Sequence, residues 1–510
     1  MFKTIEKEKG YWINLLLLII IAIFLPFTIE SLYLLLNPEQ YGGSYTIFQT
    51  MPYISDDVWY FNQVKSMIVY GHPLGYYGYD GSHALIGNFG AHGWFILLPD
   101  YFFCKFFGLN YNSGTVVNII LFSVLIFVFG YFFDCSKIKV IFFAVILFAP
   151  FTIYFLDGWL MEGIISFWGS ICAILLSRYG ESKNNSFVKW GLIAVVILAS
   201  LSKVTWCVLV PPCLYVLFTN VYSAKAVKFK NALLTLGITA VFSIMAFIFY
   251  IIFSAPYFEG SYGTYVIFDQ IKNNGFIGIV NIITETVDKI ISTFVKNESV
   301  FYNLNAIYIL VVLLFSVIWG IIYRGSKYSF IPLFVMVADI LGVISLYVGG
   351  IGAIKTITPA ATFALVYMYS QSDFKFSLGI GAMCFLFLLG SFIYQVHYGE
   401  SYTQIYNEEK ESELKYLERY MSQIDIDSNT DNPWDNTVAF ELMEGNPGDN
   451  ALMLMPAGTG LMMYQKFPSA SDMYEKYIIL TEYNSYKLGE FQSEGYSILC
   501  EFDGNIILNK

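Results

Sequence analysis

Long apolar runs constrain this chain more than any other feature of its sequence. Eleven stretches are almost free of charge, and most have the roughly 17–25 residues that a helix needs to cross a bilayer. They cover about residues 12–35, 115–133, 140–156, 160–176, 189–202, 204–219, 231–254, 303–323, 329–348, 356–370 and 376–396. Only 13% of the 510 residues are charged, about half the share of a soluble domain. The sequence therefore predicts a mainly α, polytopic membrane protein and excludes a soluble enzyme, a disordered protein and a nucleic-acid binder.

The run 189–219 has two readings. It forms either two short spans or one long span with Lys203 near its centre. With two spans, 14 of the 21 basic residues before position 397 fall on the side of the N-terminus. The positive-inside rule then makes that side cytoplasmic. We therefore expect a cytoplasmic N-terminus, a transmembrane body over 1–397, and long outer loops at 36–114 and 255–302.

The last part of the chain differs in composition. Residues 397–510 hold seven Lys and Arg against 20 Asp and Glu. A charged helix is expected at about 401–424. Short strand-like runs follow at 437–442, 451–455, 477–481, 496–502 and 505–508. Asp503-Gly504 between the last two is typical of a hairpin turn. We expect a small acidic α/β domain over 398–510, outside the cytoplasm.

Two adjacent carboxylates, Asp56 and Asp57, open the first outer loop. One of them can take a proton from an acceptor hydroxyl as a general base. Together they can hold a divalent cation such as Mg²⁺ or Mn²⁺ that neutralises a phosphate leaving group. The structural alternative is that one of them caps a helix that begins at Val58. The two roles are compatible.

Three of the four histidines, His72, His83 and His92, lie in the same loop. Histidine is a common metal ligand, but these spacings match no metal motif. Their Gly and Pro neighbours favour structured turns. We expect them to contact substrate or to support the loop.

Four ionisable residues fall at predicted span ends on the outer side: Asp157, Glu162, Lys203 and Lys355. Charges at membrane depth are costly and are candidates for function. Two lysines that converge there would suit a lipid phosphate. The alternative for each lysine is that it snorkels to water. Asp339, in the middle of a predicted span, needs a partner, for which we expect a Ser or Tyr of a neighbouring helix, and it is not expected to be catalytic.

The loop motif Pro52-x-x-Ser-Asp56-Asp57-x-x-Tyr60, the long outer loop and the acidic stretch after the third span resemble the GT-C glycosyltransferases. This superfamily includes protein O-mannosyltransferases and the aminoarabinose transferase of lipid A. The resemblance implies a polyprenyl-phosphate or polyprenyl-diphosphate sugar donor. It also implies that Asp56 or Asp57 is the catalytic base or a metal ligand. The stretches around Lys203 and Lys355 are similar to basic patches of that family.

Together these features predict a membrane glycosyltransferase that moves a sugar from a polyprenyl-phosphate lipid to a glycan, lipid or protein acceptor of the cell envelope. Lys203 and Lys355 would hold the phosphate, while Asp157 and Glu162 would shape the acceptor or metal site. Two alternatives stay open. One is a polysaccharide polymerase or ligase that works through Arg and His in outer loops, and the other is a lipid or glycan transporter without enzymatic activity.

Overall fold

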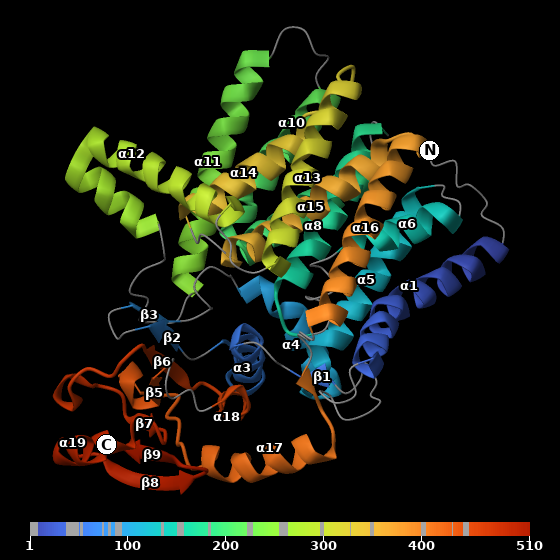
Figure 1. Ribbon diagram of the computed structural model, residues 1–510. Coiled ribbons are helices and arrows are strands. Elements are labelled where there is room, and N and C mark those ends of the chain that lie inside the picture. Colours follow the sequence, from blue (N-terminus) through green and yellow to red (C-terminus); the bar gives the residue numbers. More distant parts are fainter. Residues whose placement is uncertain are drawn as a thin grey trace.

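The computed structural model describes most of the chain (Figure 1). The described residues are 9–36, 50–51, 55–73, 76–79, 83–86, 94–133, 137–149, 158–181, 185–221, 228–253, 264–295, 300–326, 328–346, 351–398, 404–430, 432–441 and 448–510.

Each of the eleven predicted runs contains a helix. These are α1 (Lys9–Leu36), α5 (Ser113–Phe132), α6 (Lys137–Leu147), α8 (Glu162–Glu181), α9 (Ser186–Ser202), α10 (Val210–Val221), α11 (Lys228–Phe253), α13 (Val300–Ile322), α14 (Ile331–Leu346), α15 (Ile351–Gln371) and α16 (Phe374–Tyr398). By length and composition, five described helices can cross a membrane: Ser113–Phe132, Glu162–Gly180, Asn231–Ile248, Asn303–Ile322 and Phe374–Ile393. The chain is a mainly helical membrane protein.

Helices α8 and α15 form the centre of the helical body, with α14, α13 and α9 packed around them. Small side chains let α15 lie close to its neighbours, because Ala360, Ala361 and Ala364 are fully buried. The peripheral helix α11 contrasts with this, since Leu236 and Met245 are exposed. Apolar side chains on the outside of a membrane body face lipid rather than water.

The helical backbone is interrupted at Lys203. Helix α9 ends at Ser202, Lys203 is extended with φ −150° and ψ 123°, and the short 3₁₀ helix η3 (Val204–Leu209) leads into α10. Helix α10 packs against α9. This arrangement favours two segments over one continuous span.

The loops carry helices, of which the sequence indicated only one: the helix expected to begin at Val58 begins at Ser55 in the structure. The first loop holds α3 (Ser55–Tyr70), the 3₁₀ turn η2 (Trp94–Ile96) and α4 (Leu98–Phe107). Helix α12 (Thr264–Val295) lies in the second loop and is kinked at Gly275, where φ is 55°. In Figure 1, α3 lies between the helical body and the C-terminal sheet.

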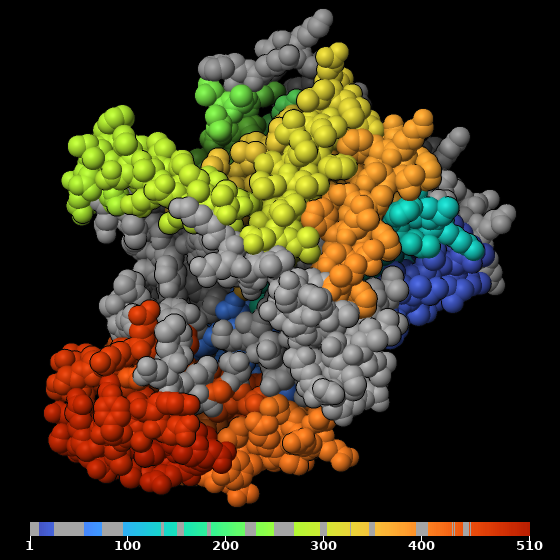
Figure 2. Space-filling view, in the orientation of Figure 1, coloured from blue at the N-terminus to red at the C-terminus, as the bar shows by residue number. Residues whose placement is uncertain are grey.

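The C-terminal sheet is built from both ends of the sequence. Its strand order is β3-β2-β6-β5-β7-β9-β8. The tail contributes β5 (Thr437–Glu441), β6 (Gly460–Tyr464), β7 (Tyr477–Leu480), β8 (Ser497–Phe502) and β9 (Asn505–Asn509), and the first loop contributes β2 (Tyr76–Tyr79) and β3 (His83–Ile86). Strand β2 pairs in parallel with β6, with Tyr77 opposite Leu461. The tail forms one mass at the end of the molecule (Figure 2).

In the tail, one expected strand is wrong and one strand was missed, while the expected hairpin and charged helix are present. The run 451–455 is not a strand, because the short helix α18 (Asp449–Met453) covers most of it. Strand β6 was not predicted. The hairpin at Asp503 and Gly504 is confirmed, with φ values of 43° and 76°. The charged helix is α17 (Glu408–Met421), which begins at an Asn407 side chain that accepts a hydrogen bond from Lys410 N.

The remaining short elements are β1 (Thr50–Met51), paired with β4 (Gln404–Ile405), the 3₁₀ turns η4 (Pro433–Asn436), η5 (Ala470–Asp472) and η6 (Ser485–Lys487), and helix α19 (Leu488–Ser493).

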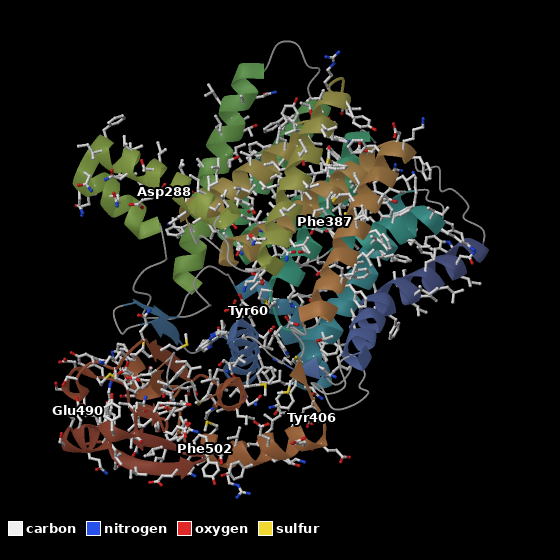
Figure 3. All side chains as sticks on the ribbon, in the orientation of Figure 1. Tyr60, Asp288, Phe387, Tyr406, Glu490 and Phe502 are labelled. Atoms are coloured by element: carbon white, nitrogen blue, oxygen red, sulfur yellow. The ribbon has the colours of Figure 1, made fainter. Side chains whose placement is uncertain are left out.

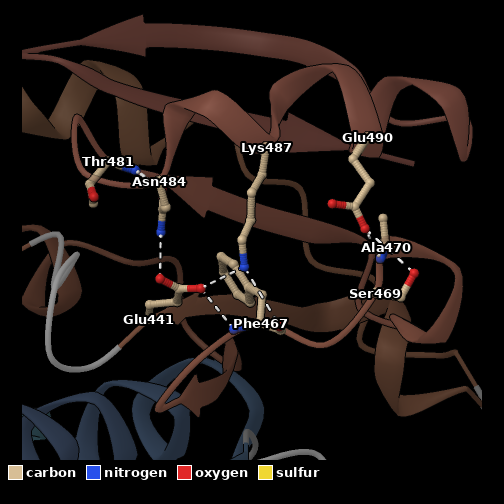
Figure 4. Close-up of polar contacts among 8 residues, drawn as sticks. All are labelled: Glu441, Phe467, Ser469, Ala470, Thr481, Asn484, Lys487 and Glu490. Atoms are coloured by element: carbon tan, nitrogen blue, oxygen red, sulfur yellow. Dashed lines mark hydrogen bonds and ion pairs between the residues drawn. The ribbon is translucent and has the colours of Figure 1, made fainter.

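A buried polar network lies at the carboxyl end of β5 (Figure 4). Glu441 accepts hydrogen bonds from Phe467 N at 2.7 Å, Lys487 Nζ at 3.0 Å and Asn484 Nδ2 at 3.3 Å. Burial alone would raise the pKa of Glu441, but these hydrogen bonds outweigh it and hold the pKa below its ordinary value. Open parallel sheets bind ligands at this edge. Here the edge is filled by the protein's own side chains, so the network is structural.

We expect Lys487→Met to destabilise the tail by about 3–5 kcal/mol, because it leaves the buried carboxylate of Glu441 without its cation. Adding Glu441→Leu should recover much of the loss, since a buried pair can often be replaced by apolar side chains. Thermal unfolding of the purified protein, followed by limited proteolysis of the tail, measures both. Lys415→Met is the matched control, because its pair with Glu411 is exposed. Equal losses in Lys487→Met and Lys415→Met would contradict the prediction.

Candidate functional site

The two acids of the first loop have different surroundings. Both lie in the first turn of α3, where the helix dipole favours negative charge. Asp57 is buried, and its Oδ1 accepts a hydrogen bond from Trp159 N at 2.6 Å. Asp56 contacts the ammonium group of Lys355 instead. Asp57 therefore stabilises the fold, and Asp56 faces a cation.

The segment before α8 is shaped to receive Asp57. A Cβ atom at Gly158 would lie 2.9 Å from Asp57 Oδ1, so a side chain there would displace the carboxylate. Asn118 Nδ2 donates to Gly158 O at 3.2 Å, and Trp159 Nε1 donates to Tyr111 O at 2.7 Å. Asp57 thus joins α3 to the helical body.

Lys355 connects Asp56 to a second acid. It lies near the start of α15, and its Nζ is 4.0 Å from Oε1 of Glu162, the first residue of α8. These helices pack side by side, which brings Lys355 and Glu162 together. The side chains of Asp56 and Lys355 are 21% and 18% exposed, while that of Glu162 is 2% exposed. A ligand can therefore reach Asp56 and Lys355 at one edge of the cluster.

Lys203 forms the inner part of the same cluster. It is 1% exposed and lies within electrostatic reach of Glu162, Asp339, Lys355 and Asp56. The alternative that Lys203 snorkels to water is therefore wrong. Its extended backbone at the break between α9 and η3 places it in the body.

Asp339 of α14 is the partner at the inner end. Its side chain is 1% exposed, and it interacts electrostatically with Lys203. Within the described ranges, neither of its carboxylate oxygens has a hydrogen-bond partner. The expectation of a Ser or Tyr partner is therefore wrong, because the packing of α14 against η3 brings Lys203 to Asp339 instead.

The structure does not place the other candidate residues in this cluster. His72 follows the C-terminal end of α3, with Nδ1 3.0 Å from Tyr70 O. Tyr70 is about 21 Å from Asp56 along the helix, at 1.5 Å per residue. The backbone of His83 lies in β3, opposite Tyr79 of β2. Asp157 and His92 lie outside the described residues.

The described carboxylates of the cluster lie next to lysine ammonium groups. No group of three or more His, Cys, Asp or Glu that could hold a metal occurs in the part of the chain that the structure describes. Asp57, one of the two expected ligands, directs Oδ1 to the Trp159 backbone. Metal binding by Asp56 and Asp57 stays a prediction, and the positive charge that the described cluster shows comes from Lys203 and Lys355.

This arrangement combines a reachable carboxylate with two lysines of different depth. Lysine ammonium groups bind phosphate as point charges, and a carboxylate within hydrogen-bond reach of a hydroxyl can take its proton. Asp56 and Lys355 are at the accessible edge, and Lys203 is beneath them. The cluster can therefore hold an anion next to a base.

Comparisons with known proteins find similar folds at low identity. A family-model comparison and a comparison with curated proteins find no match. The chain is similar to a crystal structure of ArnT from Cupriavidus metallidurans bound to undecaprenyl phosphate, with 8% identity, 98% of each chain covered and a TM-score of 0.48. The apo state of that ArnT gives a TM-score of 0.37 at 8% identity, over 98% of this chain and 97% of that one.

The chain is also similar to an oligosaccharyltransferase from Archaeoglobus fulgidus. The identity is 12%, the TM-score is 0.44, and the match covers 93% of this chain and 69% of that one. ArnT and the oligosaccharyltransferase are both GT-C glycosyltransferases, the class that the sequence resembles. At these identities the likeness concerns the fold, so function is argued below from the residues of the cluster.

We expect Gly158→Ala to lower the stability of the folded protein by on the order of 1–3 kcal/mol, because the new methyl group overlaps the Asp57 carboxylate. Gly342→Ala in α14 is the matched control, since a Cβ there meets nothing within 4 Å. Thermal melting of both purified variants in detergent gives the comparison. Similar melting temperatures would show that the contact between Gly158 and Asp57 is not tight.

Proposed function

We propose that this protein is a membrane glycosyltransferase that transfers a sugar from a polyprenyl-phosphate lipid to an acceptor hydroxyl at the outer face of the membrane. The observation that carries the proposal is the cluster in which Asp56 contacts Lys355 beside Glu162 and Lys203. The cluster draws these residues from four separate parts of the chain. Such convergence of charges in an apolar body is costly and is typical of a functional site.

The proposed reaction is a single displacement at the anomeric carbon of the donor sugar. The acceptor oxygen forms the new bond to this carbon as its proton passes to the Asp56 carboxylate. The bond between the anomeric carbon and the phosphate oxygen breaks, and the electron pair leaves on the polyprenyl phosphate. Lys355 and Lys203 stabilise the charge that develops on that oxygen. The configuration at the anomeric carbon is inverted.

Phosphate suits the cluster better than a neutral leaving group does. Two lysines next to each other repel unless anions separate them. Glu162 and Asp339 already supply anions around Lys203, while Lys355 at the accessible edge can reorient toward a ligand. A phosphate at that edge would place the sugar next to Asp56. The lipid chain of the donor would then extend along the apolar surface of the body.

The proposal places the cluster on the outer side of the membrane, with the N-terminus in the cytoplasm and the tail outside. The distribution of basic residues supports this orientation. The break at Lys203 also supports it, because two segments keep the count of spans odd. The polymerase alternative depends on Arg and His in outer loops, and His72 lies at the far end of α3.

We expect Asp56→Asn to lower turnover by roughly 10²–10⁴-fold, because an amide cannot take the acceptor proton. Asp57→Asn should keep most of the activity, because an amide oxygen can still accept the hydrogen bond from Trp159 N. The measurement is the release of free polyprenyl phosphate from a panel of synthetic polyprenyl-phosphate sugars by the purified protein. Full activity of Asp56→Asn would overturn its role as the base. Loss in both variants would favour a shared role of the acidic pair.

The lysines are tested through binding rather than turnover. Lys203→Met and Lys355→Met should each weaken binding of undecaprenyl phosphate by roughly 10- to 100-fold, since a charged hydrogen bond contributes about 1.5–3 kcal/mol. Lys105→Met is the control, because Lys105 is an exposed lysine of α4 that donates to Tyr101 OH. Titration of detergent-solubilised protein with the lipid gives the affinities. Equal affinity in all three variants would contradict the proposed phosphate site.

A further inference from the structure

Helix α3 lies between the two parts of the molecule, and Tyr60 on it marks this position (Figure 3). From Asp57 to Ile68 its described side chains are buried or half-buried. Its first turn carries the acids of the proposed site. Whatever holds the rest of α3 therefore sets where Asp56 lies.

One face of α3 binds the tail through backbone groups. Asn62 Nδ2 donates to Leu452 O at 2.9 Å, and Lys65 Nζ donates to Met453 O at 3.2 Å and Met455 O at 2.8 Å. Ser66 Oγ accepts a hydrogen bond from Gly458 N at 2.7 Å. Residues 62, 65 and 66 have the spacing of one helix face, so the contact runs along the axis of α3.

The Lys65 ammonium group binds at the C-terminal end of α18. The last carbonyl groups of a helix have no partner within it, and the negative end of the helix dipole favours a cation. Lys65 binds carbonyl oxygens at and just after that end. Burial lowers the pKa of Lys65 to about 8, although Glu418 opposes the shift. An apolar side chain would avoid this cost, so the lysine contributes defined geometry rather than stability.

A chain of contacts leads from Lys65 to the acids. The Lys65 ammonium lies 5.7 Å from the centre of the Phe61 ring, and Phe61 meets Trp159 edge to face at 5.1 Å. The backbone N–H of Trp159 holds Asp57. The chain after α3 is also held, because β2 pairs with β6 of the tail. The helix is thus fixed to the body at its first turn and to the tail along its second half.

We propose that the tail positions α3 for catalysis and that Lys65 is the positioning residue that sets the location of Asp56 relative to Lys355. The reaction that this serves rests on the proposed function, but the docking of α3 by the tail does not. Lys65 touches no reacting atom in this scheme. It acts through the helix, whose rigidity carries a displacement at Lys65 to the first turn.

The test compares Lys65→Met, which removes both hydrogen bonds, with Lys65→Arg, which keeps a charged donor, and with Lys105→Met as the surface control. Amide hydrogen exchange of the full-length protein in detergent is read for residues 55–70, with 437–441 as a reference for the folded tail. Lys65→Met should exchange faster only in 55–70. Ser66→Ala removes the acceptor for Gly458 N and is a second, smaller perturbation if Lys65→Met does not fold.

Turnover and binding then separate positioning from general stability. Release of polyprenyl phosphate by Lys65→Met should fall by roughly 10²-fold, the cost of a displacement of about 1 Å at a reacting group. Undecaprenyl phosphate binding should stay unchanged, because Lys203 and Lys355 belong to the body. Lys65→Arg should restore most of the turnover.

Unchanged exchange over 55–70 in Lys65→Met would overturn the proposal, whatever happens to turnover. Loss of undecaprenyl phosphate binding together with faster exchange would also overturn it, because Lys65 would then be a general stabilising residue. If the parent protein releases no polyprenyl phosphate from any donor of the panel, the proposed function fails. The exchange measurement still decides whether the tail docks α3 through Lys65.

Discussion

A charge inside an apolar helical body must lie next to an opposite charge, because water is not there to solvate it. Here the acids Asp56, Glu162 and Asp339 alternate with the lysines Lys355 and Lys203. These residues come from different helices or helix breaks, so the body must be assembled before the charges can meet. The packing of α8 against α15, which carries buried small residues, makes that assembly possible.

Much of the fold could be predicted because lipid imposes a simple rule on sequence. A backbone that crosses a bilayer must satisfy its own hydrogen bonds, so each long apolar run predicted a helix. The tail was harder, because a short apolar run fits a strand or a helix equally well. Residues 451–455 were therefore assigned to a strand although α18 covers most of them. Strands β2 and β3 could not be foreseen, since β2 pairs in parallel with β6 in a distant part of the sequence and β3 pairs only with β2.

The candidate site could be predicted in part for a similar reason. Glu162, Lys203 and Lys355 stood out as charges at span ends, and Asp56 as one of an acidic pair. The different role of Asp57 depends on one backbone N–H, that of Trp159, and local sequence does not indicate such a contact. Lys65 gave no motif either, because its partners are backbone carbonyl groups of the tail. A side chain that binds backbone groups in a distant part of the chain leaves no local pattern of residue types.

The pairing of β2 with β6 has a consequence for how the protein is made. Strand β2 is synthesised early, and its hairpin with β3 can form at once. Its parallel partner emerges only after all the helices of the body have been synthesised, so the edge of the hairpin stays open throughout that time. Open strand edges invite pairing with other chains. Completion of the sheet thus waits for β6, and a chain that stalls before β6 keeps the edge of β2 open to pairing with other chains.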